Sequence, residues 1–311
     1  MFRYILLRIG LALPTIFLVS VLVFLMLYLT PGDPASIYIG DRQATPERLA
    51  QVRHEMGLDR PIWVQYADFA TGMLRGSGAR SLQTNRPVSD EIMERLPSTL
   101  ELTFSAFAIS AILGLGLGIL AALRPNSWFD TSTRAVAMAG VSMPVFWLGA
   151  LVIFVFSVQL RWFPVTGEGG WERLVMPAFV LGLVTAAPLM RLVRGSMLEV
   201  MGQDYITTAR AKGQREQHVV IGHGLRNALI PIITVMGLQL GALLGGAVIT
   251  EAVFARPGIG RLIVDSILSK DFPVVQATIL YVAIIYIVIN LIVDISYGVL
   301  DPRIRLGQGQ R

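Results

Sequence analysis

The residues with a capacity for chemistry are few, and they do not form a catalytic or metal-binding set. The histidines are His54, His218 and His223, and the last two are five apart without the His-Glu-x-x-His pattern of a zinc helix. Cysteine is absent, which excludes disulfides and thiolate chemistry. The dipeptide Gly-Lys is also absent, so the sequence has no phosphate-binding loop. We therefore expect no catalytic residue, no metal and no cofactor in this chain.

The most informative polar stretch lies between positions 204 and 231. It begins Asp204-Tyr-Ile-Thr-Thr-Ala-Arg-Ala-Lys-Gly213. Asp204 suits a helix N-cap, the cations suit the last turn, and Gly213 suits a left-handed terminator. A second helical segment is expected to end before Pro231. A plain solvated connector would carry the same charges, so the residues alone also allow that alternative.

The apolar composition places most of the chain in a membrane. Hydrophobic residues make up 54% and charged residues 15%, whereas a soluble domain has about 25% charged residues. Six uncharged stretches are long enough to cross a bilayer, which takes about 20 residues. We expect helices, because lipid offers the backbone no hydrogen-bond partners. The predicted spans are 9–30, 102–123, 135–160, 174–190, 228–250 and 273–293.

Positive residues indicate the orientation. A net charge of +5 could suggest a nucleic-acid partner, but the cations lie in loops beside the spans, so we expect none. With the N-terminus inside, Arg3, Arg8, Arg124 and Arg191 all lie on the cytoplasmic side. Both termini are therefore expected in the cytoplasm. The first apolar stretch is longer than a signal-peptide core, which favours an uncleaved membrane anchor.

The segment 31–97 is predicted to be a small helical domain outside the membrane. Thr45 can cap a helix that starts at Pro46, and Gly57 suits the position after its end. A second helix is expected over 61–73, with aromatic residues that suit a membrane interface. The domain either covers the membrane body as a lid or offers a docking surface, and both interpretations stay open.

Glycines and prolines predict how the spans pack and bend. Glycines at helical spacing in the second and fifth spans allow helix backbones to approach closely; they are Gly114, Gly116 and Gly118, and Gly237, Gly241, Gly245 and Gly246. Tight packing is favoured over a hinge. Pro144, Pro177, Pro188 and Pro231 are expected to kink spans or mark their ends.

Polar residues beside the spans carry two further expectations. Ser98 and Glu101 have capping-box spacing, which predicts that the second span starts there. Asp294, near the cytoplasmic end of the last span, is the main ionisable candidate in the spans. The scarcity of such groups argues against an ion or proton relay.

Many motifs, in order, resemble the dipeptide/oligopeptide family of ABC importer permeases. The runs 205–213 and 223–231 are similar to its EAA coupling loop, with Thr207, Thr208 and Ala209 at the Glu-Ala-Ala positions. The turn at 30–34 and the run 56–61 fit the subunit type with a long first outer loop, whereas 75–81 departs from it. Further similar runs are 237–254, 257–261, 271–276, 290–294 and 301–305.

The resemblance implies an all-α integral membrane protein with six transmembrane helices in the type I ABC importer permease fold, with a small helical extracytoplasmic loop domain. It would be a multi-pass protein of the bacterial inner membrane. Its parts would be a tail and first span (1–30), the loop domain (31–97), a type-1 transmembrane domain with coupling loop 191–230 (98–301), and a cytoplasmic tail (302–311).

The partners implied by the resemblance are a second homologous permease, two cytoplasmic ABC ATPases, an extracytoplasmic substrate-binding protein and membrane lipid. ATP and Mg²⁺ would bind the ATPases. Added bulk or charge at Ala209 or Ala211 is expected to uncouple transport. The residues expected to contact or support an ATPase are Asp204, Tyr205, Thr208, Ala209, Arg210, Ala211, Lys212, Gly213, Arg226 and Asn227; the lining of the substrate path is not identified.

The expected function is half of the translocation path in ATP-driven import of di- and oligopeptides delivered by the binding protein. The same machinery could import glutathione, a nickel chelate or an oligosaccharide. Two other classes remain: an ion-coupled secondary transporter, which would need relay groups in its spans, and a membrane anchor without a transport role.

Overall fold

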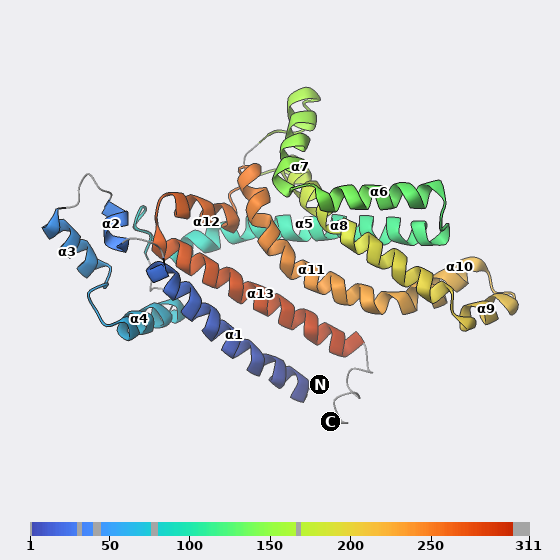
Figure 1. Ribbon diagram of the computed structural model, residues 1–311, viewed down its shortest axis with the longest axis horizontal. Helices are drawn as coiled ribbons and strands as arrows, with labels where there is room; N and C mark the ends of the chain where they lie inside the picture. Colours follow the sequence, from blue (N-terminus) through green and yellow to red (C-terminus); the bar gives the residue numbers. More distant parts are fainter. Residues whose placement is uncertain (1, 30–32, 40–44, 76–79, 166–168, 301–311) are drawn as a thin grey trace. The chain divides into compact units, whose positions relative to one another are not determined.

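Long helices dominate the structure. This computed structural model describes residues 2–29, 33–39, 45–75, 80–165 and 169–300. The described part is helical, apart from turns, loops and one isolated antiparallel bridge between Arg80 and Pro87. The all-α membrane fold expected from the sequence is confirmed. Five helices are long and apolar enough to cross a membrane (Figure 1): α1 (Phe2–Leu29), α5 (Val88–Leu123), α8 (Glu172–Met201), α11 (Arg226–Val253) and α13 (Phe272–Leu300).

Some predicted features lie outside the described residues. They are the turn at 30–32, the segment 76–79 within the divergent run 75–81, and the tail 302–311. The side chain of Asp294 is also outside the described part, although its backbone belongs to α13.

The third predicted span consists of two helices with a sharp break. α6 (Trp128–Ser142) and α7 (Val145–Val152), which continues as a π-helical segment η1 (Ile153–Gln159), are bent by 108° relative to each other. Met143, just before Pro144, has an extended backbone (φ −87°, ψ 128°). A proline disfavours the helical conformation of the residue before it, so the kink expected at Pro144 is confirmed. Counted as one span, this pair is the sixth.

The chain forms two compact units. The first comprises Met1–Ser98 and Pro257–Leu291, and the second comprises Thr99–Arg256 and Ile292–Arg311. The first unit includes the short helices α2 (Pro34–Ile39), α3 (Pro46–Glu55), α4 (Ile62–Arg75) and α12 (Ile259–Leu268). A buried cluster joins α12 to the starts of α5 and α13; it contains Val88, Ile92, Ile259, Leu262, Val274 and Ala277.

The two helices predicted in the outer loop are confirmed as α3 and α4. Thr45 Oγ1 accepts a hydrogen bond from the Arg48 backbone N–H at 3.3 Å, as an N-cap should, and Gly57 follows α3 with φ +69°. On α4, the rings of Tyr66 and Phe69 pack on Phe24 of α1, with centroids 5.5 and 5.8 Å apart. These aromatic side chains attach the loop helix to the first span.

Two polar residues at the start of α13 connect other parts of the first unit to it. Gln276 Nε2 donates to the backbone oxygens of Val23 and Phe24 on α1, each at 3.2 Å. Asp271 accepts a hydrogen bond from Ser81 Oγ at 2.6 Å, and both side chains are buried. The run 271–276, which the sequence indicated only by resemblance, therefore holds α1 and the outer loop against α13.

In the second unit, α8 packs closely against α5. A β-carbon added at Gly114 or Gly118 of α5 would lie 2.7 Å from side-chain atoms of Leu189 or Val193 on α8. Gly116 of α5, in contrast, has no atom within 4 Å of such a position. The prediction of tight packing is confirmed at Gly114 and Gly118.

The predicted start of the second span is wrong. α5 begins at Val88 and runs through Ser98 without interruption. Glu101, one of the two residues that suggested a cap, pairs instead with Arg256. The neighbouring Thr99 Oγ1 donates to the buried Glu251 Oε1 at 2.6 Å. Tertiary contacts therefore override the local capping signal. Pro231 likewise lies inside α11 and does not end a helix there.

We expect Gly118→Ala to destabilise the protein, because the new methyl group would also approach the Met190 backbone oxygen to 2.9 Å. Overpacking of this kind costs about 1–3 kcal/mol. Gly116→Ala is the matched control, and it should be neutral or stabilising because alanine has the better helix propensity. Thermal unfolding of the two purified variants in detergent would compare them. Equal unfolding temperatures would contradict the close contact of α5 with α8.

Candidate functional site

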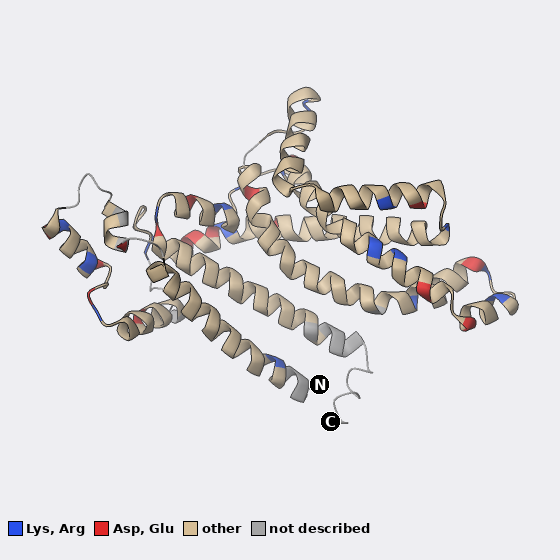
Figure 2. Ribbon diagram, in the orientation of Figure 1, with Lys and Arg blue, Asp and Glu red and all other residues tan. Residues whose placement is uncertain are grey.

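The predicted loop 191–230 is largely helical. α8 continues to Met201, well past the predicted end of the fourth span, and Arg191 and Arg194 belong to it. A short helix α9 (Asp204–Ala211) follows, then α10 (Glu216–His218) and a π-helical turn η2 (Val219–Leu225), which leads directly into α11 (Figure 1). Figure 2 shows acidic and basic residues gathered at α9 and α10, while α11 is almost free of charge. The candidate site is thus a polar helical turn between two long apolar helices.

The ends of α9 agree with the prediction except at its first residue. The N-cap is Gln203, with an extended backbone and no side-chain cap bond, and Asp204 is the first helical residue. The prediction of Asp204 as the cap is wrong by one position. Its carboxylate still lies in the first turn, where negative charge is favoured. Gly213 has φ +75°, and its N–H donates to Arg210 O at 2.9 Å, as predicted for the terminator.

One face of α9 is buried and attaches it to the rest of the turn. Ile206 and Ala209 pack with Val219 of η2, and Met201 at the end of α8 lies against this cluster. Ala209 is buried, so its side chain contacts residues of this chain. Tyr205, Thr208, Ala211 and Lys212, also expected at the site, are exposed. α9 therefore presents a polar face on an apolar base.

An ion pair braces α9 against α10. Arg210 Nε and Nη2 donate to the two carboxylate oxygens of Glu216 at 3.1 and 2.7 Å. This bonding raises the pKa of the Arg210 guanidinium and lowers the pKa of the Glu216 carboxyl, because each hydrogen bond favours the charged forms. Both side chains remain substantially exposed, so solvent screens the pair.

The segment that returns to the membrane also contacts α9. Asn227 Nδ2 donates to Tyr205 Oη at 3.2 Å and to His223 O at 2.8 Å. His223 Nε2 lies 3.0 Å from Gln214 Oε1. Arg226 is exposed at the first position of α11. The structure thus brings Asn227 and Tyr205 together across the turn.

Sequence reasoning missed Glu216, Ile206 and Val219. An apolar pair three residues apart, Ile206 and Ala209, was the available signal for the buried face. The partner of Arg210 had no comparable signal, because its distance depends on the turn at Gly213.

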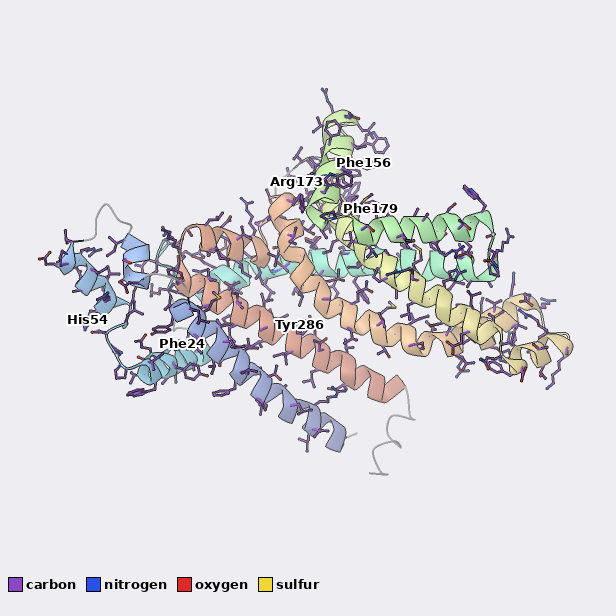
Figure 3. All side chains as sticks on the ribbon, in the orientation of Figure 1. Phe24, His54, Phe156, Arg173, Phe179 and Tyr286 are labelled. Atoms are coloured by element: carbon purple, nitrogen blue, oxygen red, sulfur yellow. The ribbon has the colours of Figure 1, made fainter. Side chains whose placement is uncertain are left out.

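No metal centre accompanies this site in the described part of the chain. Within residues 2–29, 33–39, 45–75, 80–165 and 169–300, no group of three or more His, Cys, Asp or Glu side chains could hold a metal ion. His54, on α3 (Figure 3), lies 2.7 Å from Asp59 Oδ2 through Nδ1. The rings of His218 and His223 meet edge to face, with centroids 5.8 Å apart.

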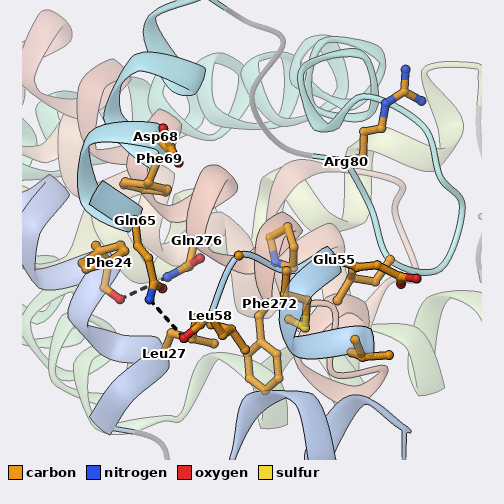
Figure 4. Close-up of a pocket in the computed structure, with 15 residues that line it drawn as sticks. Phe24, Leu27, Glu55, Leu58, Gln65, Asp68, Phe69, Arg80, Phe272 and Gln276 are labelled. Atoms are coloured by element: carbon orange, nitrogen blue, oxygen red, sulfur yellow. Dashed lines mark hydrogen bonds between the residues drawn. The ribbon is translucent and has the colours of Figure 1, made fainter. Parts of the chain in front are cut away.

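The first unit contains a cavity of about 480 Å³, shown in Figure 4. Apolar residues from α1, α3, α4 and α13 contribute much of its lining. Gln65 Nε2 donates to Leu58 O at 3.3 Å, and Gln276 Nε2 donates to Phe24 O at 3.2 Å. These two polar side chains are therefore engaged within the chain. No residue predicted for coupling lines this cavity.

Solved structures place the fold in the ABC importer permease class. The chain is similar to an inward-facing MetNI methionine ABC transporter in two crystal forms, with TM-scores of 0.60 and 0.57. The identities are 20% and 22%, and each match covers 70% of this chain and 99% of the other. At such identities the likeness concerns the fold alone.

The chain belongs to the family described as the binding-protein-dependent transport system inner membrane component, which matches residues 114–306. The family's N-terminal counterpart matches residues 1–103. The chain is therefore a permease subunit, the non-catalytic inner-membrane component of a bacterial ABC importer that works with ATPase and other subunits. It falls within the peptide and glutathione branch.

Relatives of nearly equal length support this branch. The chain is 44% identical over 305 residues to the glutathione transport system permease protein GsiC of Escherichia coli (strain K12), covering 98% of this chain and 99% of that protein. GsiC of Shigella flexneri serotype 5b (strain 8401) is 43% identical over the same coverage.

Loss of the Arg210–Glu216 pair should loosen α9. Folding lowers the pKa of Glu216. The pair therefore stabilises the turn at pH values above the ordinary pKa of a glutamate, and this stabilisation is lost as the pH falls through the pKa of the folded state. We expect Glu216→Gln to raise amide exchange over 204–213 about twofold at neutral pH. After correction for intrinsic exchange rates, acidification should raise amide exchange over 204–213 in the parent. In Glu216→Gln it should cause no further increase.

Glu199→Gln, which removes an exposed carboxylate from nearby α8, is the control and should leave exchange in α9 unchanged. Identical exchange in the parent and in Glu216→Gln at neutral pH would mean that the pair does not hold α9.

Proposed function

We propose that this chain forms half of a path for small peptides and that glutathione, a tripeptide, is its cargo. The observation that carries the cargo is the 44% identity to glutathione permeases over essentially full length. We favour glutathione over general di- and oligopeptides, which were the cargo first expected from the sequence. Nickel chelates and oligosaccharides have no comparable support.

α9 is the proposed coupling helix. Its exposed face, with Tyr205, Thr208, Ala211 and Lys212, would dock into a groove of a cytoplasmic ATPase. The buried face rests on Val219 and on Met201 at the end of α8. A push on α9 would therefore act directly on α8, and rigid helices would alternate the access of the path. Asp204, Arg210, Gly213, Arg226 and Asn227 shape and hold the helix, whereas Ala209 supports it from below.

The proposed complex contains this chain, a second homologous permease, two ATPases and an extracytoplasmic substrate-binding protein. ATP and Mg²⁺ would bind the ATPases, so this chain needs no cofactor of its own. With α9 in the cytoplasm, both chain termini are cytoplasmic and the helices α2 to α4 face outward. ATP binding can drive the cycle only if it favours one conformation over the other.

Uptake of labelled glutathione by proteoliposomes that contain the whole complex tests the cargo and its energy source. We expect uptake that requires ATP inside the lumen equivalent to the cytoplasm and that persists when an ionophore collapses ion gradients. Unlabelled glutathione should compete better than a neutral dipeptide. Stronger competition by dipeptides would restore the broader peptide cargo, and gradient-driven uptake without ATP would indicate a secondary transporter.

Bulk on the two faces of α9 should have different effects. Ala211→Trp adds bulk to the exposed face, so the fold should survive while docking weakens and uptake falls about tenfold, the effect of 1.4 kcal/mol. Ala209→Trp cannot fit beside Ile206 and Val219, so α9 itself should lose order. Uptake, ATPase co-purification and amide exchange over 204–213 separate the two effects. Normal uptake by Ala211→Trp would remove this face from the proposed docking surface.

A further inference from the structure

A buried ion pair joins the start of α6 to α8 in the second unit. Arg194 Nε and Nη2 donate to Asp130 Oδ1 and Oδ2 at 2.6 and 2.7 Å. Asp130 also accepts a hydrogen bond from the Asn126 backbone N–H at 2.9 Å, and Arg134 lies 3.5 Å away. The Asp130 side chain is fully buried, and that of Arg194 is 20% exposed. Every carboxylate oxygen thus has at least one donor.

Elsewhere, the contact between α6 and α8 includes several small side chains. Ala137 of α6 packs with Ala187 and Met190 of α8. A β-carbon added at Gly140 would lie 3.4 Å from the Ala187 β-carbon. Small side chains allow the two backbones to approach closely, but they form no directional contact. The bidentate pair, which has a fixed direction, is what defines the position of α6 along α8.

The same helix leads to α9. Met201, at the end of α8, packs on the buried face of α9. Val193 and Met197 of α8 belong to a buried cluster with Val220 of η2, and Arg194 follows Val193 directly. Contiguous packing therefore connects α9 to the residue that holds Asp130.

We infer that Asp130 and Arg194 are positioning residues of the transport cycle: their ion pair makes α6 follow α8 when α9 is displaced. This inference rests on the proposed role of α9. Buried ion pairs are poor stabilisers compared with apolar side chains of similar size, and their best-supported use is to specify register. In this protein, the ion pair would fix the register of α6 along α8, two helices that must move together.

The first experiment removes both charges at once. Asp130→Asn with Arg194→Met leaves no unpaired buried charge, and the asparagine can still accept from the Asn126 N–H. In the reconstituted complex, we expect near-parental unfolding temperature and ATPase activity, but about tenfold less cargo moved per ATP hydrolysed. The same changes at the exposed pair Arg261 and Asp265, whose atoms lie 3.4 Å apart, form the control and should change nothing. Unchanged cargo per ATP in the first variant would overturn the inference.

A rescue experiment separates transmission from stability. The chain has no cysteine, so Gly140→Cys and Ala187→Cys introduce a single possible disulfide within it at a suitable β-carbon separation. Oxidation should restore cargo moved per ATP in the charge-free variant, and reduction should abolish it again. Failure of the formed disulfide to restore coupling would mean that the ion pair does not act by joining α6 to α8.

A third measurement does not depend on the identity of the cargo. Met138→Cys on α6 and Gly195→Cys on α8 carry spin labels at exposed positions. The distance between the labels should stay constant between the nucleotide-free and ATP-bound complex, and should change in the charge-free variant. A distance that changes in the parent would contradict a fixed joint. A constant distance between the labels in a complex that does not take up glutathione would contradict only the proposed cargo.

Discussion

The close contact between α5 and α8 is the interaction on which the second unit depends. Lipid tails are as apolar as the side chains between helices, so association relies on van der Waals packing and buried hydrogen bonds. Gly118 of α5 lies against the Val193 side chain of α8. A β-carbon added at Gly182 of α8 would lie 2.8 Å from the Ala106 backbone oxygen of α5. A side chain at either glycine would separate the helices. α8 also packs on α6, α7 and α11, and its end supports α9.

Much of the fold could be predicted, because an uncharged stretch about twenty residues long is seldom anything but a membrane-spanning helix. The errors came from charges. Arg191 and Arg194 made the fourth span end early in the prediction, although α8 continues to Met201. Helices can leave the bilayer without ending, and hydropathy does not register this. Ser98 and Glu101 suggested a helix start, but tertiary partners decided the role of Glu101.

The candidate site was predictable in outline and not in its contacts. Glycine's tolerance of positive φ made Gly213 a reliable terminator, and the polar run located α9 to within one residue. The face on which Ala209 lies depended on Val219, beyond a turn whose geometry the sequence does not state. Long-range pairs such as Asp130 with Arg194 were equally unpredictable, because two charged residues sixty-four positions apart carry no mutual signal in one sequence.

Burial gives the ion pairs around α8 and α9 different mechanical roles. Arg210 and Glu216 are exposed and screened, so a docking partner can replace either contact at little cost. Breaking Asp130 from Arg194 would leave a charge in a site from which water is largely excluded, so this pair persists through movements of the helices. The turn at α9 can therefore adapt to a partner surface, while the joint behind it keeps its geometry. A displacement at α9 would reach this joint through the apolar packing of Met201 on α9 and of Val193 and Met197 on η2, which does not involve the exposed pair.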